Sequence, residues 1–195
     1  MTDRPTTSPR RRLSQQDRHA QLLAVARELV RDEGTDLLTL GRLAERAGVT
    51  KPVVYDHFGN RAGVLAELYR AFDARQHAVL DAALAETEQT LPAVAAVVAG
   101  AYVDCCLAEG RELADVVSAL SGSAVLDQLR QDAEDGYLAK CSAALEPFAG
   151  PVDPAGLRAV VGAGDALARA ALTGRIDGDQ ARQTLARVIQ AVVPA

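Results

Sequence analysis

Apolar residues recur along this chain at intervals of three and four positions, the spacing that places them on one face of an α-helix. An early example lies between about Asp17 and Asp32, where Leu22, Leu29 and Val30 share a face and Gly34 follows as a stop signal. Alternating β-branched runs, which are typical of strands, are nearly absent. The pattern therefore predicts an all-α protein.

Glycine, proline and aspartate residues divide the rest of the helical pattern into segments. Two short helices are expected near residues 40–47 and 51–57, and a longer one begins after Asn60 and continues towards Leu84. A further five helices are expected, in chain order, at residues 92–108, 112–120, 123–148, 155–173 and 179–193.

The segment from Thr39 to Arg61 (TLGRLAERAGVTKPVVYDHFGNR) predicts two short helices joined by a tight turn. Thr39 and Thr50 suit the N-cap positions of the two helices, and Gly48 supplies the left-handed conformation that the turn needs. The apolar positions of both helices are expected to share one core: Leu40, Leu43, Ala44, Ala47, Val54 and Phe58. This arrangement is typical of a helix-turn-helix.

If Val54 and Phe58 point inward, the other side chains of the second helix face outward or sideways, where DNA would lie. Lysine and arginine contact phosphates or guanine edges, hydroxyl and imidazole groups suit phosphate oxygens, and a valine methyl suits thymine. Asp56 is left out, since its carboxylate either repels phosphate or accepts from a cytosine amine. The candidate DNA contacts are Thr39, Arg42, Thr50, Lys51, Pro52, Val53, Tyr55, His57 and Arg61.

A pair of amphipathic helices can also pack within a bundle and touch nothing else. The segment as a whole, however, resembles the signature of the TetR family of repressors, IA-x-x-AGV-[ST]-x-x-x-[LV]-Y-x-HF followed by a basic residue. The matching positions are Leu43-Ala44, Ala47-Gly48-Val49, Thr50, Val54-Tyr55 and His57-Phe58, with Arg61 where the family usually has lysine. The resemblance covers about residues 18–65 and implies a DNA-binding transcriptional regulator, with repression as the usual outcome.

The resemblance implies three parts: a disordered basic arm (1–17), a three-helix helix-turn-helix domain (18–62) and a helical ligand-binding and dimerisation domain (63–195). Residues 1–61 carry 11 Lys and Arg against 8 Asp and Glu, whereas residues 62–195 carry 10 against 18. The net charge of -5 therefore conceals a basic N-terminal part. Attraction to phosphate decays within about 8 Å at physiological salt, so this local charge matters more than the total. Arg10, Arg11 and Arg12 could enter a neighbouring minor groove.

The resemblance also implies a homodimer that binds a palindromic DNA operator and responds to an unknown small-molecule effector. Small residues of one late helix (Ala155, Ala159, Gly162, Ala163, Ala166 and Ala170) and apolar residues of the last (Leu185, Val188, Ile189 and Val192) suit a dimer interface. Alternatively, these residues complete the core of the monomer. The candidate walls of an effector pocket are the bulky, centrally placed Tyr69, Phe72, Tyr102, Leu107, Val117, Leu120, Tyr137 and Phe148.

No Ser/His/Asp set, phosphate-binding glycine loop or metal-ligand spacing occurs in the sequence, so we expect neither an enzyme nor a cofactor or metal. Cys105, Cys106 and Cys141 are interpreted as small buried hydrophobes, with a thiol sensor as the alternative for the adjacent pair. His77 and Asp165 could line a polar pocket or lie on solvated faces.

Membrane and export segments are also not expected. No apolar run approaches the roughly 18–20 residues of a membrane span, and the N-terminal stretch lacks the apolar centre of a signal peptide. A cytoplasmic protein follows from these patterns. The alternative function is a helical DNA-binding protein that is regulated through protein partners and binds no ligand.

Overall fold

The computed structural model describes residues 13–120 and 123–193, and within these ranges the chain forms α-helices and one short 3-10 helix but no strand. The all-α prediction is therefore confirmed. The elements are α1 (Gln15–Glu33), the 3-10 helix η1 (Thr35–Leu37), α2 (Leu40–Ala47), α3 (Lys51–Phe58), α4 (Arg61–Glu86), α5 (Leu91–Leu120), α6 (Ala124–Ala149), α7 (Pro154–Leu172) and α8 (Gly178–Val192).

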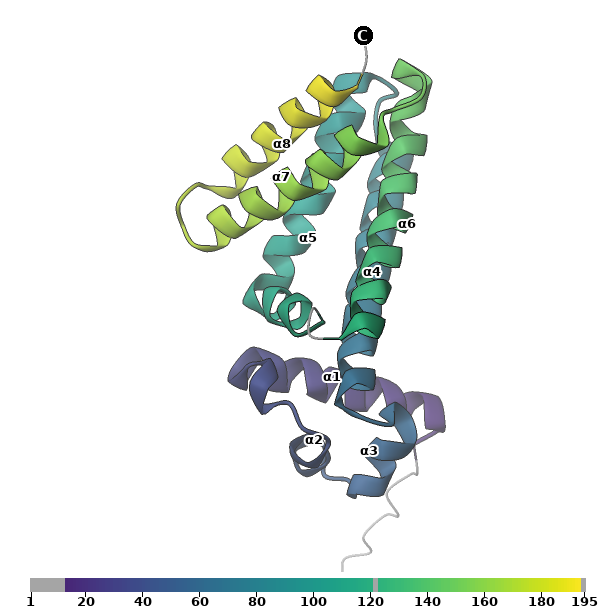
Figure 1. Ribbon diagram of the computed structural model, residues 1–195, viewed down its shortest axis with the longest axis vertical. Helices are drawn as coiled ribbons and strands as arrows, with labels where there is room; N and C mark the ends of the chain where they lie inside the picture. Colours follow the sequence, from purple (N-terminus) through teal and green to yellow (C-terminus); the bar gives the residue numbers. More distant parts are fainter. Residues whose placement is uncertain (1–12, 121–122, 194–195) are drawn as a thin grey trace, which may run out of the picture.

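The molecule is elongated, with two groups of helices joined by α4 (Figure 1). Helices α1, α2 and α3 lie together at one end. Helix α4 starts among them and runs beside α6 into the larger group, where α7 and α8 lie side by side against α5 (Figure 1). A movement of α4 would therefore displace residues in both groups of helices.

Two helix boundaries illustrate how single residues set this arrangement. The hydroxyl of Ser14 accepts a hydrogen bond from the backbone N–H of Asp17 at 3.0 Å, so α1 begins two residues earlier than the sequence pattern predicts. Gly110 has φ 62° and ψ -145°, a conformation that favours glycine, and it bends α5 where the sequence predicts two separate helices. The first segment of α5 thus enters the larger group, while the second turns towards α1.

The buried apolar side chains form two clusters. One is built from α1–α3 and the first part of α4, and it extends to Cys105, Val116, Leu120 and Leu126. The other fills the space between α5, α6, α7 and α8 and includes Leu80 from α4. Helix α4 contributes to both clusters, which ties the N-terminal group to the rest of the chain.

Part of the predicted dimer face is used inside the monomer. Leu185 and Ile189 of α8 are 1% and 0% exposed and belong to the second cluster, and Val188 and Val192 pack against it. Assigning Leu185 and Ile189 to a surface between subunits was therefore wrong. The periodicity of α8 identifies an apolar face, but it does not distinguish the core of one subunit from a contact between two.

One helical segment is more apolar than the sequence analysis allowed. Residues Leu91–Gly110 have a mean hydropathy of 1.9 over a length that could cross a membrane. Half of this segment is buried inside the protein, where α5 packs against α4, α7 and α8. An apolar helix at the centre of a folded chain satisfies the same length and composition test as a membrane span, so the segment is explained by its packing.

Candidate DNA-binding surface and effector pocket

Helices α2 and α3 are joined by the tight turn that the sequence predicts. The Thr39 hydroxyl caps α2 by accepting from the backbone N–H of Arg42 at 3.2 Å. Gly48 is left-handed, with φ 64° and ψ 35°, and the N–H of Val49 donates to the carbonyl of Ala44 at 3.0 Å. These bonds satisfy the end of α2 and redirect the chain into α3, which completes a helix-turn-helix.

Helix α3 buries one face and exposes the other. Val54 is fully buried and Phe58 is 7% exposed, so both contribute to the cluster around α1–α4, as predicted. Tyr55 is 54% exposed, an unusual value for a large aromatic side chain. The other candidate contacts of this helix and its cap divide into the exposed Thr50, Lys51 and Pro52 and the half-buried Val53 and His57.

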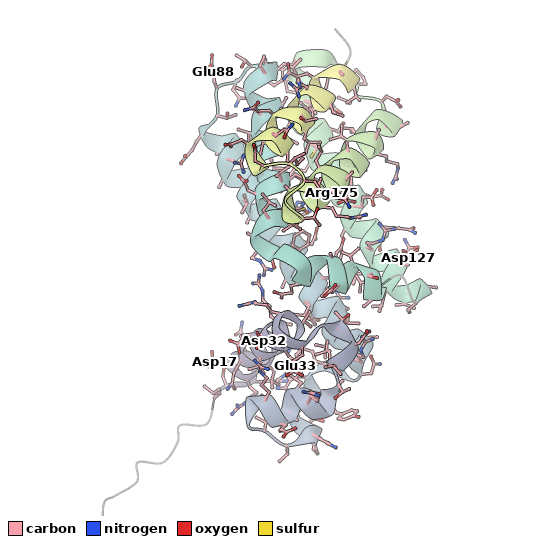
Figure 2. All side chains as sticks on the ribbon, turned by 90° about the vertical axis from the view of Figure 1, so that its left-hand side faces the viewer. Asp17, Asp32, Glu33, Glu88, Asp127 and Arg175 are labelled. Atoms are coloured by element: carbon pink, nitrogen blue, oxygen red, sulfur yellow. The ribbon has the colours of Figure 1, made fainter. Side chains whose placement is uncertain are left out.

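The remaining basic candidates already have partners within the protein. Arg42 forms an ion pair with Glu33. Arg46 forms ion pairs with Glu33, at 3.1 Å, and with Asp32. Figure 2 labels Asp32 and Glu33, which lie at the end of α1 on the N-terminal group of helices. The carboxylates of α1 therefore fix the guanidinium groups of two α2 arginines and partly offset the positive charge of these arginines.

Arg61 is placed differently from the other candidates. Its Nε donates to the carbonyl of Leu38 at 3.1 Å, and Nη2 donates to the carbonyl of Thr35 at 2.8 Å. These bonds connect the first residue of α4 to the segment between α1 and α2. The side chain therefore has a structural role, and its contact with phosphate stays a prediction. Arg10, Arg11 and Arg12 of the predicted arm lie outside the described residues.

His57 lies beside a residue that the sequence analysis did not select. Its ring centroid is 5.4 Å from that of His19, which in turn lies 5.0 Å from the ring of Phe58. The Nε2 atom of His19 is 3.8 Å from a carboxylate oxygen of Glu67. These contacts connect α1, α3 and α4, so His57 is oriented by packing against the adjacent helices.

A pocket of about 100 Å³ lies between α4, α5, α6 and α7. It brings together five of the eight predicted wall residues: Tyr69, Phe72, Tyr102, Val117 and Tyr137. The other three lie elsewhere. Leu120 is fully buried in the cluster shared with α1–α4, and Leu107 and Phe148 pack against the second cluster. The prediction by bulk and central position identified the aromatic walls but could not separate them from ordinary core residues.

The polar side chains of the pocket were largely missed. Asp73, Gln76, Arg130 and Glu134 line it, as does Asp165, which the sequence analysis left open between a pocket and a solvated face. A usable signal existed on α4, since Tyr69, Phe72, Asp73 and Gln76 recur at intervals of three and four residues. Positions on α6 and α7 depend on how these helices pack, which the sequence pattern does not specify.

Hydrogen bonding within the pocket is uneven. The Tyr102 hydroxyl donates to Asp165 Oδ1 at 2.5 Å, which connects α5 to α7. The buried Tyr137 hydroxyl has no hydrogen-bond partner among the described residues.

Burial raises the pKa of Cys106 to about 12, with the Asp165 carboxylate as a further cause, and burial raises the pKa of Cys141 to about 12. Burial also raises the pKa of Cys105, the other member of the adjacent pair. The Cys105 and Cys106 thiols therefore stay protonated at neutral pH and are poor nucleophiles, which argues against a thiol sensor at this pair.

A group of ion pairs joins the N-terminal helices to the end of α5. Glu109 pairs with Arg27 of α1 and, at 2.9 Å, with Arg75 of α4. Glu112 pairs with Arg27 at 3.1 Å and with Arg31 at 3.6 Å. Burial raises the pKa of the Glu112 carboxyl above its ordinary value, and the two arginines oppose that shift. The bent segment of α5 is thereby connected to the helix that supports α2 and α3.

The described part of the chain thus combines an N-terminal helix-turn-helix with a larger group of helices that holds an internal pocket. Residues 22–68 match the family model for bacterial regulatory proteins of the tetR family. Over this N-terminal domain, about a quarter of the chain, the protein is similar to TetR-family transcriptional regulators.

Two curated relatives resemble part of the chain in sequence, and one solved structure shares its fold. The chain is 41% identical over 73 residues to the HTH-type transcriptional activator FasR of Mycolicibacterium smegmatis, covering 36% of this chain and 33% of that protein. It is 39% identical over 56 residues to the class A tetracycline repressor protein from transposon 1721 of Escherichia coli, covering 29% and 26%. The alignments thus span about a third or less of these relatives. A TetR-like transcriptional regulator from Rhodococcus sp. RHA1 shares the fold, with a TM-score of 0.70, 20% identity and coverage of 92% and 97%.

Proposed function

We propose that this chain is a homodimeric repressor that binds a palindromic DNA operator through α3 and is released from it by a small-molecule effector bound in the pocket. The observation that carries the proposal is the division of α3 into a buried face and an exposed face. Val54 anchors the helix, whereas Lys51 and Tyr55 extend from a rigid support into solvent. A helix presented in this way suits the major groove of DNA.

The exposed groups suggest how contacts are divided. Lys51 forms no ion pair among the described residues, so its ammonium group is available to a phosphate or a guanine edge. The Tyr55 hydroxyl suits a phosphate oxygen, and the half-buried Val53 offers a methyl group to thymine. Thr39 and Thr50 stand at helix N-termini, where backbone N–H groups favour phosphate. Arg42 would first have to exchange part of its pairing with Glu33 for a phosphate.

The exposed face of α7 supports a dimer. Ala155, Ala159, Gly162 and Ala166 follow each other at intervals of three and four residues, and all four are exposed. Their small side chains would allow a second copy of the helix to approach closely. Two α3 helices would then occupy successive turns of the major groove, about 34–36 Å apart, and the operator would share the twofold symmetry of the protein.

Helix α4 supports coupling between the pocket and the DNA-binding domain. Tyr69, Phe72, Asp73 and Gln76 of α4 line the pocket, and Arg61 at its first turn is bonded to the segment between α1 and α2. An effector that shifts α4 would change the separation of the two α3 helices. Moving the population from 1:99 to 99:1 needs a difference of about 5.5 kcal/mol in effector binding between the two states.

Operator binding is the first test. The purified full-length protein is titrated with DNA from the region upstream of its own gene, and footprinting locates any protected site. We expect protection of a palindrome by a dimer, with affinity that falls steeply as salt is raised. Equal affinity for unrelated DNA of the same length, or a monomer on the DNA by light scattering, would contradict the proposal.

Activation is a second candidate because one curated relative of the DNA-binding domain is a transcriptional activator. The two outcomes are separated by transcription in vitro from the protected promoter. Repression predicts that added protein lowers transcript yield, whereas activation predicts an increase. Regulation through a protein partner predicts that small molecules never change the affinity for DNA.

A further inference from the structure

We infer that the effector pocket selects organic cations, such as quaternary ammonium or protonated amine groups, over neutral and anionic molecules of the same shape. The inference rests on the proposed function for the role of the pocket, and it adds the chemical class of the ligand. It is argued from the charges and aromatic rings that line the pocket.

Carboxylates outnumber cations in the pocket lining. Asp73, Glu134 and Asp165 line it together with one guanidinium, that of Arg130. Arg130 is already engaged on its own helix, with Asp127 at 3.3 Å and Glu134 at 3.1 Å. Glu134 also forms an ion pair with Arg158, at 3.3 Å. The charges of Arg130 and Glu134 are therefore compensated without a ligand.

Two carboxylates are left without such compensation. Neither Asp73 nor Asp165 forms an ion pair with an arginine or lysine in the part of the chain that the structure describes. Asp165, an exposed residue of α7, accepts a hydrogen bond from the neutral Tyr102 hydroxyl, and Asp73 lies 3.5 Å from the Nε2 atom of His77. The positive charge of Lys140 also acts on Asp73, but its ion pair is with Asp81. Burial raises the pKa of Asp73 above its ordinary value, which means that its charged form lacks a full counter-charge. A bound cation would supply that counter-charge.

The walls of the pocket add a second attraction for cations. Tyr69 and Phe72 come from α4, and Tyr102 and Tyr137 have ring centroids 5.7 Å apart across α5 and α6. Aromatic faces attract cations, and trimethylammonium groups in particular are bound in aromatic cages. Burial raises the pKa of Tyr69 to about 12, and the nearby carboxylates add to that shift. The phenols therefore stay neutral and do not contribute charge of their own.

Other ligand classes fit these groups less well. An anion would meet two uncompensated carboxylates, and its only partner in the lining would be a guanidinium that already has two. A neutral molecule would leave Asp73 partly desolvated without a full counter-charge, which is unfavourable. A second pocket of about 260 Å³, whose lining also includes Arg169, shares Cys106, Val117 and Asp165 with the first. It provides room beside Asp165 for the tail of a larger amine.

The tyrosine content of the chain gives a direct readout. Four tyrosines and no tryptophan are present, and three of the four line the pocket. In full-length Tyr55→Phe protein, all tyrosine fluorescence therefore comes from pocket residues. The probes are choline, its neutral isostere 3,3-dimethylbutan-1-ol and the anion 3,3-dimethylbutanoate, each titrated at constant ionic strength with sodium chloride as the salt control. Calorimetry on the unaltered protein provides an independent Kd.

We expect choline to bind at least about tenfold more tightly than the alcohol, and the anion to bind most weakly. The double variant Asp73→Asn/Asp165→Asn keeps the shape of both side chains and should remove most of this preference. Glu86→Gln on α4 is the matched control, because it removes the same charge from an exposed position about 20 Å along the helix. It should leave the preference unchanged.

Equal or tighter binding of the alcohol or the anion would overturn the inference, as would an unchanged preference in the double variant or no binding of choline. Footprinting on the operator separates these outcomes from failure of the proposed function. If DNA is bound and released by a neutral molecule, the function stands and the inference fails. If choline binds as expected but the chain has no operator, the ligand class stands and the regulatory function fails.

Discussion

The ring of Tyr102 lies directly against the backbone of Gly164. A Cβ atom at Gly164 would come within 2.6 Å of Tyr102 Cε1, closer than side-chain atoms ordinarily approach. The same arrangement places the Tyr102 hydroxyl 2.5 Å from Asp165, the next residue of α7. Helices α5 and α7 can therefore meet at the pocket only because position 164 has no side chain.

Gly164→Ala should consequently destabilise the protein and distort the pocket. The added methyl forces the Tyr102 ring or α7 to move, and overpacking of this kind costs about 1–3 kcal/mol. Gly100→Ala is the control, since a Cβ at Gly100 of α5 would meet only the Cδ atom of Arg182, at 4.0 Å, an ordinary contact. That variant should be neutral or more stable, because alanine favours a helix over glycine by about 0.5–1 kcal/mol. Urea denaturation measures both, and equal stability of the two variants would contradict this explanation.

The helices were predictable from the sequence because their signals are local. Gly48, Gly110 and Asn60 mark helix ends whose positions agree with the pattern to within about two residues. The short helix η1 was missed, because its three residues carry no periodicity. The use of Leu185 in the monomer core was only the alternative to a dimer contact, since a periodic apolar face does not reveal what covers it.

The α3 surface and the pocket were predictable from the sequence to different degrees. The α3 surface could be derived because Val54 and Phe58 fix which face is buried, and the exposed face follows from helical geometry. The pocket could not, because it depends on distant residues such as Tyr102 and Asp165 meeting across two helices. The hydrogen bonds from Arg61 to backbone carbonyls could not be predicted either, since every residue has a backbone carbonyl and the sequence does not indicate which one accepts.

Lys51→Ala should weaken operator binding without changing the fold. The side chain is exposed in α3, and loss of a base or phosphate contact costs about 1–3 kcal/mol. If the partner is a phosphate, the slope of log affinity against log salt should fall by about 0.9. The chain has only one other lysine, Lys140 of α6, which makes Lys140→Ala the matched control. Fluorescence anisotropy with operator DNA measures both, and equal affinities would exclude Lys51 as a contact.

Tyr55→Phe tests a single hydroxyl group on the same face of α3. It removes only the hydroxyl of a 54% exposed ring, so α3 keeps its packing. Loss of one hydrogen bond to a charged phosphate should lower the affinity for DNA by about 1.5–3 kcal/mol. The same titration measures this variant, with thermal unfolding to establish that stability is unchanged. Undiminished affinity would remove the Tyr55 hydroxyl from the DNA-binding surface.

Arg61→Ala should lower both stability and DNA affinity. Its guanidinium donates to the carbonyls of Thr35 and Leu38. The Thr35 carbonyl would keep the backbone N–H of Leu38 as a donor, whereas the Leu38 carbonyl would lose the Arg61 donor. A stability loss of about 1–3 kcal/mol is expected for each carbonyl left unsatisfied in a buried position. Denaturation and DNA titration on the same variant separate the two roles. Lost affinity at unchanged stability would identify Arg61 as a phosphate contact instead of a structural residue.

The buried thiols predict a loss of stability in alkaline solution. Burial raises the pKa of Cys106 and Cys141 from an ordinary value of 9.0 to about 12. Between these values the folded state holds protons that the unfolded state has released, so the free energy of unfolding falls as pH rises. The expected slope is about 1.4 kcal/mol per pH unit for each thiol. Burial also raises the pKa of Cys105 and of Tyr69, Tyr102 and Tyr137, so these groups add to the fall in the same range. Urea denaturation at about pH 8, 9 and 10 measures the slope, and Cys141→Ala should lower it by up to about 1.4 kcal/mol per pH unit between the two higher values. If the slope in that variant equals the slope of the unaltered protein, the Cys141 thiol is not desolvated in the folded state.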